Sequence, residues 1–161
     1  MISVDYKSTQ VTNQDAVGWS ALKPYERGGR LRIVSFDYTV PTGTIAIAKV
    51  VSMATLPPGV MLLGGKLDNT ALGTGALADI GLRGHDGNGN IDDTSGATVA
   101  DDADLLGNDI DMAAAGNDDF NHTAALNFLY VTKKEVDLVF TVVGAVWAAA
   151  AVVKGYLMYS E

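Results

Sequence analysis

The clearest pattern along the chain is an alternation of apolar and polar side chains between residues 30 and 40. Within RLRIVSFDYTV, apolar side chains at 34, 36, 38 and 40 alternate with polar side chains at 35, 37 and 39. Successive side chains of a β-strand point to opposite faces, so a period of two predicts a half-buried strand. Pro41-Thr42-Gly43 ends the pattern with residues that favour turns.

Further strands are expected up to residue 82. TIAIAKVVSMATL is apolar on both faces apart from Lys49, which is typical of a strand buried inside a sandwich. The turn signal Leu56-Pro57-Pro58-Gly59 follows, and then VMLLGGKL and ALADIGL, separated by a turn at residues 69–75. Strands at this spacing, without a helical stretch between them, favour antiparallel pairing in a sandwich or barrel.

The C-terminal part of the chain returns to strand patterns. LNFLYVT runs into a polar turn at 133–135, and VDLVFTVVGAVW and AAVVKGYLMYS are expected to pair with each other around residues 144–151. On the last strand, residues 156, 158 and 160 lie on one side and 155, 157 and 159 on the other. The chain therefore predicts seven or eight strands in one all-β domain, residues 30–161, and no internal repeat indicates a solenoid or propeller.

Two segments depart from strand patterning. Residues 1–29 have no sustained period and end at Gly28-Gly29, so we expect an extended N-terminal arm whose Trp19 and Tyr25 pack against its own domain or a neighbouring subunit. Residues 83–121 are rich in Gly, Asp and Asn, which predicts a long acidic loop. A helical turn begun by Asp101 or Asp102 is an alternative within that loop.

The distribution of charge excludes one class of partner. Residues 79–119 hold eleven aspartates and one arginine, while the whole chain has a net charge of −8. Phosphate binding needs a basic face, so nucleic acid is not an expected partner. The acidic segment is expected to be a solvated face, which keeps a crowded protein soluble.

Composition excludes other classes. At 161 residues with 48% hydrophobic side chains, the chain is expected to fold as one compact domain. The lack of cysteine excludes disulfides and thiolate metal sites. The longest apolar run, residues 138–153, is shorter than the roughly 18 to 20 residues that span a bilayer, so no membrane partner is expected. The N-terminus has no basic start followed by an apolar run, so we expect no secretory signal.

The chain has few residues that could form a catalytic site. The two histidines, His85 and His122, both lie in the acidic region, and no nucleophile elbow, zinc-protease motif or phosphate loop accompanies them. Aspartates in a Gly-rich segment are expected to be exposed and ionised, which does not suit acid–base catalysis. We therefore predict that the protein is not an enzyme, with no catalytic residue and no cofactor.

The stretch HDGNGNIDD, residues 85–93, is the one candidate metal site. Oxygen-bearing side chains stand at every second position: Asp86, Asn88, Asn90 and Asp92. A helix-loop-helix calcium loop beginning at Asp86 needs glycine at its sixth position and glutamate at its twelfth, where this chain has Ile91 and Ala97. The favoured interpretation is a glycine-supported turn that closes a hairpin between DIGLRGH and NID. Calcium binding remains an alternative, in which distant aspartates such as Asp101, Asp102 or Asp104 supply further ligands.

The order of these segments resembles a family of proteins. GGRLRIVSFDYTVP, a Thr/Ala/Ile strand, LPPGVMLLGG with ALGTGALADIGL, the acidic DDADLLGNDIDMAAAG and a closing strand pair ending in GYLMYS together resemble small virion structural proteins of tailed bacteriophages. The resemblance covers roughly residues 28–160 and rests on the order of the segments and on their residue composition.

The resemblance implies a jelly-roll-like β-sandwich that acts as a cement or decoration protein. Such a protein is made in the host cytoplasm, binds the major capsid protein on the outer surface of an icosahedral head and is a homo-oligomer, with a trimer favoured. Repeated weak contacts on a symmetric lattice suffice for this work because each bound neighbour raises the effective concentration of the next contact. We expect the arm (Tyr6, Trp19, Tyr25) and the basic pair Arg30 and Arg32 to lie near the capsid or sister subunits.

An alternative from another class is a receptor- or carbohydrate-binding sandwich of a tail or fibre, using the acidic loops with calcium. It predicts a platform of exposed aromatic side chains in loops. Between residues 39 and 127 the only aromatic side chain is Phe120, which speaks against this alternative.

Overall fold

The structure, a computed structural model, describes residues 6–7, 30–92, 99–120 and 130–161. In these ranges the chain forms strands and turns, and no helix that could cross a membrane occurs there. The strands are β1 (Tyr6–Lys7), β2 (Leu31–Thr39), β3 (Val50–Leu56), β4 (Met61–Asn69), β5 (Ala76–Gly84), β6 (Asn90–Asp92), β7 (Val99–Ala100), β8 (Asp102–Asp111), β9 (Gly116–Asp119), β10 (Val136–Gly144) and β11 (Val152–Ser160).

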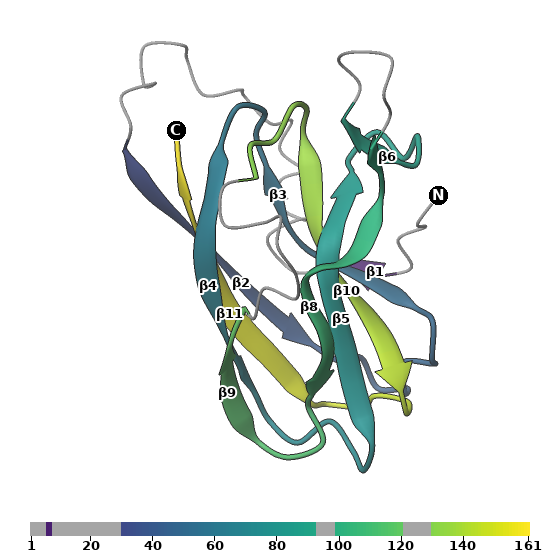
Figure 1. Ribbon diagram of the computed structural model, residues 1–161. Helices are drawn as coiled ribbons and strands as arrows, with labels where there is room; N and C mark the ends of the chain where they lie inside the picture. Colours follow the sequence, from purple (N-terminus) through teal and green to yellow (C-terminus); the bar gives the residue numbers. More distant parts are fainter. Residues whose placement is uncertain (1–5, 8–29, 93–98, 121–129) are drawn as a thin grey trace.

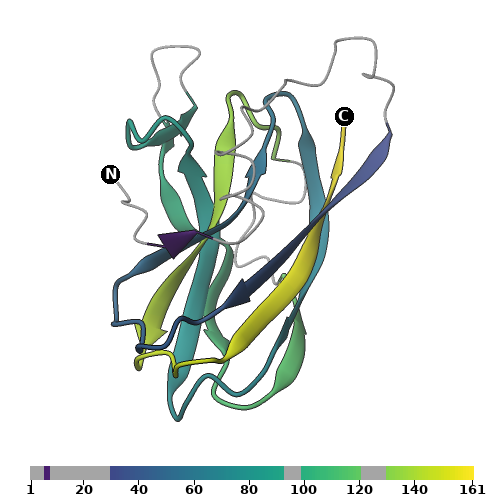
Figure 2. The same ribbon diagram turned by 180° about the vertical axis from the view of Figure 1, so that it is seen from behind.

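Two sheets face each other and form a sandwich (Figures 1 and 2). Sheet I has the strand order β1-β3-β10-β5-β8, and sheet II has the order β2-β11-β4-β9. Apart from β1, which pairs in parallel with β3, the neighbouring strands in both sheets are antiparallel. From β2 to β5 and from β8 to β11, each strand lies in the opposite sheet from its predecessor. The predicted jelly-roll-like β-sandwich is therefore confirmed.

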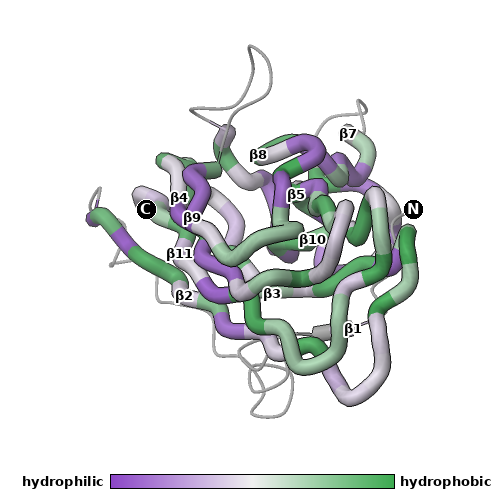
Figure 3. Tube along the Cα trace, turned by 90° about the horizontal axis from the view of Figure 1, so that it is seen from below, coloured by the Kyte–Doolittle hydropathy of each residue, from purple (hydrophilic) through white to green (hydrophobic). Residues whose placement is uncertain are grey.

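Aromatic and aliphatic side chains from both sheets meet in one core. Phe36 of β2 lies edge-on to Phe140 of β10, with ring centroids 5.6 Å apart, and this contact joins the two sheets. Phe36 also stacks on Phe120, just after β9. The fully buried Trp147 donates its indole N–H to the carbonyl oxygen of Leu77 over 3.2 Å. Figure 3, a view from below, shows hydrophobic positions along much of β3 and β10.

The predicted alternation is confirmed at both ends of the domain. On β2, Phe36 and Tyr38 are buried while Asp37 between them is partly exposed, and on β11 Leu157 and Tyr159 are buried while Tyr156 and Met158 are partly exposed. All residues of β3 are buried, as expected for a strand apolar on both faces. The first half of the predicted strand, residues 44–49, is instead a turn region in which Ile45 forms an isolated bridge with Trp147.

The predicted pairing of the last two strands is wrong. β10 pairs with β3 and β5 in sheet I, whereas β11 pairs with β2 and β4 in sheet II. β10 is apolar on both faces, so it is stabilised at the centre of a sheet with a neighbour on each side. The connection at 144–151 crosses between the sheets, with positive φ values at Gly144 and Ala150.

The prediction that residues 83–121 form one long loop is also wrong for much of the segment. β8 pairs with β5, and β9 pairs with β4, and no helical turn occurs at Asp101 or Asp102. Buried Leu105 and Leu106 anchor β8 in the sandwich, so the aspartates around them lie on an edge strand. This edge is irregular, since the register of β8 on β5 shifts twice.

Two predicted segments lie largely outside the described residues. Of the N-terminal arm, the structure describes β1, in which Tyr6 pairs with Val51 and packs against the core; Trp19 and Tyr25 lie outside the described ranges. Most of LNFLYVT also lies outside them, and its last residues contribute an isolated bridge between Val131 and Met61.

Candidate interaction surface

A buried carboxylate organises the end of sheet I near His85. The side chain of Asp137 on β10 accepts a hydrogen bond from Thr55 Oγ1 at 2.9 Å, and its Oδ1 lies 2.8 Å from His85 Nδ1. Arg83 NH1 lies 3.9 Å from the other carboxylate oxygen. The Thr55 hydroxyl is directed at the carboxylate and not at the imidazole, so these groups do not form an activated nucleophile. The cluster joins β3, β5 and β10 and is structural. His122 lies outside the described residues.

The turn after β5 confirms the glycine-supported interpretation. Gly87 and Gly89 have φ values of 72° and 78°, a region that favours glycine. Asp86 Oδ1 accepts the backbone N–H of Asn88 at 3.1 Å, and Asp86 Oδ2 accepts the Asn88 side-chain amide at 3.0 Å. The expected hairpin between β5 and β6 is wrong, because β6 pairs with β7.

The first oxygen-bearing residue of this turn, Asp86, already has a basic partner. Both carboxylate oxygens of Asp86 lie 3.0 Å from Nζ of Lys134, so an ammonium group already occupies the position that a cation would take. The hydrogen bond from Lys134, together with that from the Asn88 N–H, lowers the pKa of Asp86. Asn90 and Asp92 lie on β6. Among the described residues, no group of three or more metal-ligating side chains is close enough to hold an ion.

The aspartates of β8 and its neighbours bind backbone N–H groups of the chain itself. Asp101 Oδ1 accepts from Gly84, Asp79 Oδ1 from Asp109, and Asp111 Oδ1 from Ala113, each at 2.9 Å. A carboxylate that accepts a backbone N–H two residues ahead stabilises a turn. A carboxylate that accepts a backbone N–H across a bulge replaces the strand-to-strand hydrogen bond that the bulge removes. The acidic segment therefore has a local structural role, and its remaining carboxylates make the edge of sheet I negative.

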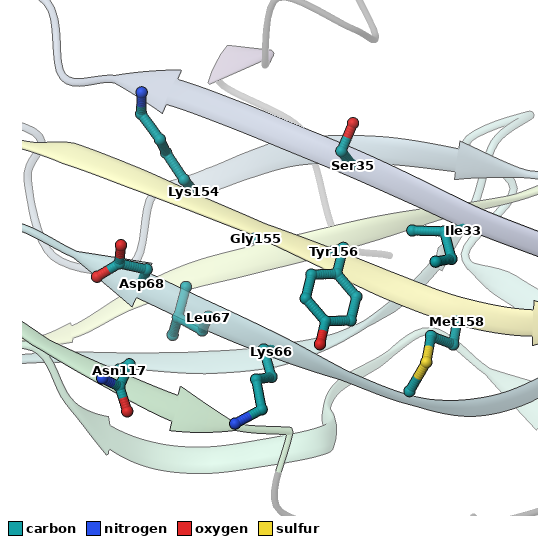
Figure 4. A pocket seen from close by; sticks show the side chains of 10 residues that line it. All are labelled: Ile33, Ser35, Lys66, Leu67, Asp68, Asn117, Lys154, Gly155, Tyr156 and Met158. Carbon is teal, nitrogen blue, oxygen red and sulfur yellow. The ribbon is translucent and has the colours of Figure 1, made fainter.

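The outer face of sheet II carries a shallow groove of about 650 Å³ (Figure 4). Tyr156 and Met158 of β11 lie near its centre, beside Ile33 of β2. Two ion pairs flank these side chains: Lys66 with Asp119 at 3.2 Å and Lys154 with Asp37 at 3.1 Å. The other lining residues are Ser35, Leu67, Asp68, Asn117 and Gly155.

The groove continues into an exposed apolar strip on β2. Leu31 and Ile33 are 60% and 61% exposed. Next to this strip lie the exposed Arg30 and also Arg32, whose Nε is 3.3 Å from Glu161 Oε2. The sequence pattern identified Tyr156 and Met158 as one side of the last strand, but it missed Leu31 and Ile33. These two have the opposite parity to the buried set at 34, 36, 38 and 40, and that mismatch is the signal that could have identified them.

Comparison with solved structures shows that other proteins share the fold of this chain. No family model matches the chain, and no curated protein matches it. Among solved structures, a chain of the capsid of Ralstonia phage GP4 superposes with a TM-score of 0.67 at 16% identity over 96% of each chain. A chain of the cyanophage Pam1 capsid asymmetric unit superposes with a TM-score of 0.58 at 19% identity, over 90% of this chain and 94% of that chain. This chain and both neighbours therefore share the sandwich fold over nearly their whole lengths.

Proposed function

We propose that the protein is a non-enzymatic structural component of a virion, of the capsid cement or decoration type. In this role it binds the outer surface of an icosahedral phage head and stabilises contacts between capsid subunits. The observation that carries the proposal is the superposition from end to end with a capsid chain of similar length, 96% of each chain at a TM-score of 0.67. The same arrangement recurs in a second phage capsid.

The charge of the chain supports a position on the outside of the head. With a net charge of −8 and an acidic edge along β8, the molecule is repelled by packaged nucleic acid. On the outside of the head these carboxylates face solvent and keep their hydration, so this position has no desolvation cost for them. The apolar and aromatic side chains of Leu31, Ile33, Tyr156 and Met158 on the outer face of sheet II are a candidate contact for the major capsid protein or for a sister subunit.

The proposed partners are the major capsid protein and further copies of the same chain, with a trimer as the favoured homo-oligomer. A groove of this size makes a modest contact on its own. Copies held on a symmetric lattice gain through avidity, because each bound copy raises the local concentration for the next contact.

The proposal is tested on particles. Heads assembled with and without the protein should be imaged, and their thermal disruption should be followed by release of nucleic acid. We expect protein density on the outer surface at a repeated symmetry position and a higher disruption temperature when the protein is present. Density at the tail, or no density on the head, would contradict the proposal.

A second candidate is a carbohydrate- or receptor-binding module of a tail or fibre. One observation favours it: the groove holds an aromatic ring, Tyr156, beside the hydrogen-bonding side chains of Lys66, Asp68 and Asn117. Aromatic stacking with adjacent polar groups suits a sugar ring. Glycan-array binding that is lost in Tyr156→Ala and retained in Tyr130→Ala would favour this function over the capsid role.

A further inference from the structure

The turn after β5 contains a reactive pair of residues, Asn88-Gly89. It is the only place in the sequence where glycine follows asparagine. The side-chain amide carbon of an asparagine lies within reach of the backbone nitrogen of the next residue, so the two groups can react within one chain and close a five-membered ring. Glycine has no Cβ to obstruct that nitrogen. This pair is therefore suited to attack by the backbone on the side chain.

The turn leaves both reacting groups accessible. The Asn88 side chain is exposed and donates its amide to Asp86, a carboxylate that is itself exposed. Water can replace a hydrogen bond of this kind at a small net cost. Gly89 accepts the N–H of Asp101 at its carbonyl oxygen over 3.1 Å, and no described hydrogen bond uses the N–H of Gly89. The attacking nitrogen is therefore not engaged by another group of the described chain.

The other asparagines among the described residues are followed by backbone that the fold holds in place. The N–H after Asn69 donates to the carbonyl oxygen of Val152 over 2.9 Å. The N–H after Asn108 donates to Asp79 Oδ1, also over 2.9 Å. The remaining two are followed by residues of β6 and β9, whose backbones belong to strand pairs. At these positions attack would first require the loss of a hydrogen bond or the distortion of a strand.

The preceding pair, Asp86-Gly87, offers a comparison within the same turn. The hydrogen bond from Lys134 lowers the pKa of Asp86, so its carboxylate stays ionised, and an ionised carboxylate resists attack by a nucleophile. The N–H of Gly87 donates to the carbonyl oxygen of Gly84 over 3.1 Å. Of the two pairs that end in glycine, the second therefore combines a neutral amide carbon with a backbone nitrogen that no described bond engages.

We propose that Asn88 is a site of spontaneous deamidation in the folded protein. The nitrogen of Gly89 forms a bond to Cγ of Asn88, and the bond from Cγ to the side-chain nitrogen breaks. The side-chain nitrogen leaves as ammonia and takes with it the proton that the Gly89 nitrogen loses. Water then opens the ring at one of its two carbonyl carbons, which gives either aspartate or isoaspartate. Solvent water is the co-reactant, and the step needs no oxidant or reductant.

The product changes the contacts of the turn. A carboxylate at position 88 cannot donate to Asp86 Oδ2 as the amide does, and its charge repels that of Asp86. Lys134 then faces two carboxylates in place of one. Isoaspartate also adds a methylene to the backbone before Gly89, whose carbonyl oxygen accepts from Asp101. The reaction needs only the folded chain and water, so it is independent of the proposed function, and its failure would leave that proposal unaffected.

The test is peptide mapping by mass spectrometry after the full chain has been incubated at mildly alkaline pH, both folded in buffer and unfolded in guanidinium chloride. Incubation continues until Asn88 of the unfolded chain is largely converted, because there the sequence alone sets the rate. We expect Asn88 of the folded chain to exchange its NH2 for OH in the same period, and faster as the pH is raised. The other described asparagines should convert more slowly in the folded chain: Asn69, Asn90, Asn108 and Asn117.

Two matched variants locate the reaction. Asn88→Gln keeps a side-chain amide but would have to close a six-membered ring, so the folded variant should show no conversion and no isoaspartate in this turn. The control is Asn117→Gln, since Asn117 is also exposed but lies in β9; Asn88 should convert in this variant as in the unmodified protein. An intact Asn88 in the folded chain, or conversion of Asn88 no faster than that of Asn117, would overturn the proposal.

Discussion

Asp79 of β5 and Asp109 of β8 face each other across the edge of sheet I, and the backbone N–H of Asp109 donates to Asp79 Oδ1 over 2.9 Å. Asp109 has a φ of 52°, which lies in the left-handed region. Burial raises the pKa of Asp79; the hydrogen bond from Asp109 lowers it, and the charges of Asp109 and Asp104 raise it further. The net effect is a carboxylate whose ionised form is disfavoured in the folded chain.

Asp79→Asn should therefore stabilise the protein at neutral pH. The asparagine oxygen can still accept the Asp109 N–H, while the buried charge and its repulsion by two neighbouring aspartates are removed. We expect the free energy of unfolding at pH 7 to rise by at most about 0.5 kcal/mol, measured by urea denaturation.

The pH dependence gives the control for this prediction. Because the pKa of Asp79 is higher in the folded chain than its ordinary 3.8, ionisation opposes folding as the pH rises through the folded pKa. Below pH 3.8 both states are protonated, so the gain from Asp79→Asn should disappear there. An equal gain at pH 3 and pH 7 would contradict the assigned cause.

Gly155 is predicted to be required for the packing of β11. A Cβ at this position would meet the carbonyl oxygen of Lys66 and the ring of Phe36, so neither the backbone of β4 nor the core ring could stay in place. Gly155→Ala should lower the free energy of unfolding by about 1–3 kcal/mol, as overpacking does. The matched control is Gly43→Ala, where an added Cβ has no atom within 4 Å; its effect should be within about 0.5 kcal/mol.

Asp137 is predicted to be one of the most costly positions to truncate. Asp137→Ala removes the acceptor used by Thr55, the hydrogen-bond partner of His85 Nδ1 and the ion-pair partner of Arg83. Breaking a buried charged network by removing one partner costs about 3–5 kcal/mol. Thermal or urea unfolding should show a loss of this size, while the exposed control Asp68→Ala should change stability by about 0.5 kcal/mol or less. Equal losses for the two variants would show that the cluster has no special role.

Calcium is not expected to stabilise the domain. Lys134 already lies against both oxygens of Asp86, and a ligand raises stability only if it binds the folded state. Melting curves in calcium and in a chelator should coincide. A calcium-dependent rise in the melting temperature that is lost in Asp86→Ala would revive the metal interpretation of this turn.

Deletion of residues 1–27 is predicted to separate folding from incorporation. The strands of both sheets apart from β1 lie beyond residue 30, so the shortened chain should keep a cooperative unfolding transition. The arm is expected to reach the capsid or sister subunits, so incorporation into particles should be lost. Incorporation at the level of the full chain would contradict this role.

The sequence predicted the strands whose patterns are simple. Alternation identified β2 and β11, and burial on both faces identified β3, because side-chain period and burial are local properties. The prediction of which strands pair was wrong, because β10 and β11 follow each other closely in the sequence but lie in different sheets. Pairing depends on which distant strands need neighbours, and a window of adjacent residues does not contain that information.

The acidic segment was misassigned for a different reason. Its composition of Asp, Gly and Asn is typical of loops, and the two buried leucines at 105 and 106 are too few to establish a period. Here the aspartates themselves make an irregular strand possible, because their carboxylates accept the backbone N–H groups that bulges leave unpaired. The candidate surface on β2 was missed because an exposed apolar side chain gives no signal until the buried face of its strand is known.

The alternation of strands between the two sheets has a consequence for how the chain reaches its native state. Since adjacent strands such as β2 and β3, or β10 and β11, do not pair with each other, local hairpins of these strands cannot serve as a folding nucleus. β2 acquires its partner β11 only when residue 160 is in place. Topologies dominated by such distant pairings fold slowly, and sheet II stays incomplete until β11 has been made. The sandwich is therefore completed only when the last strand of the described fold has been made.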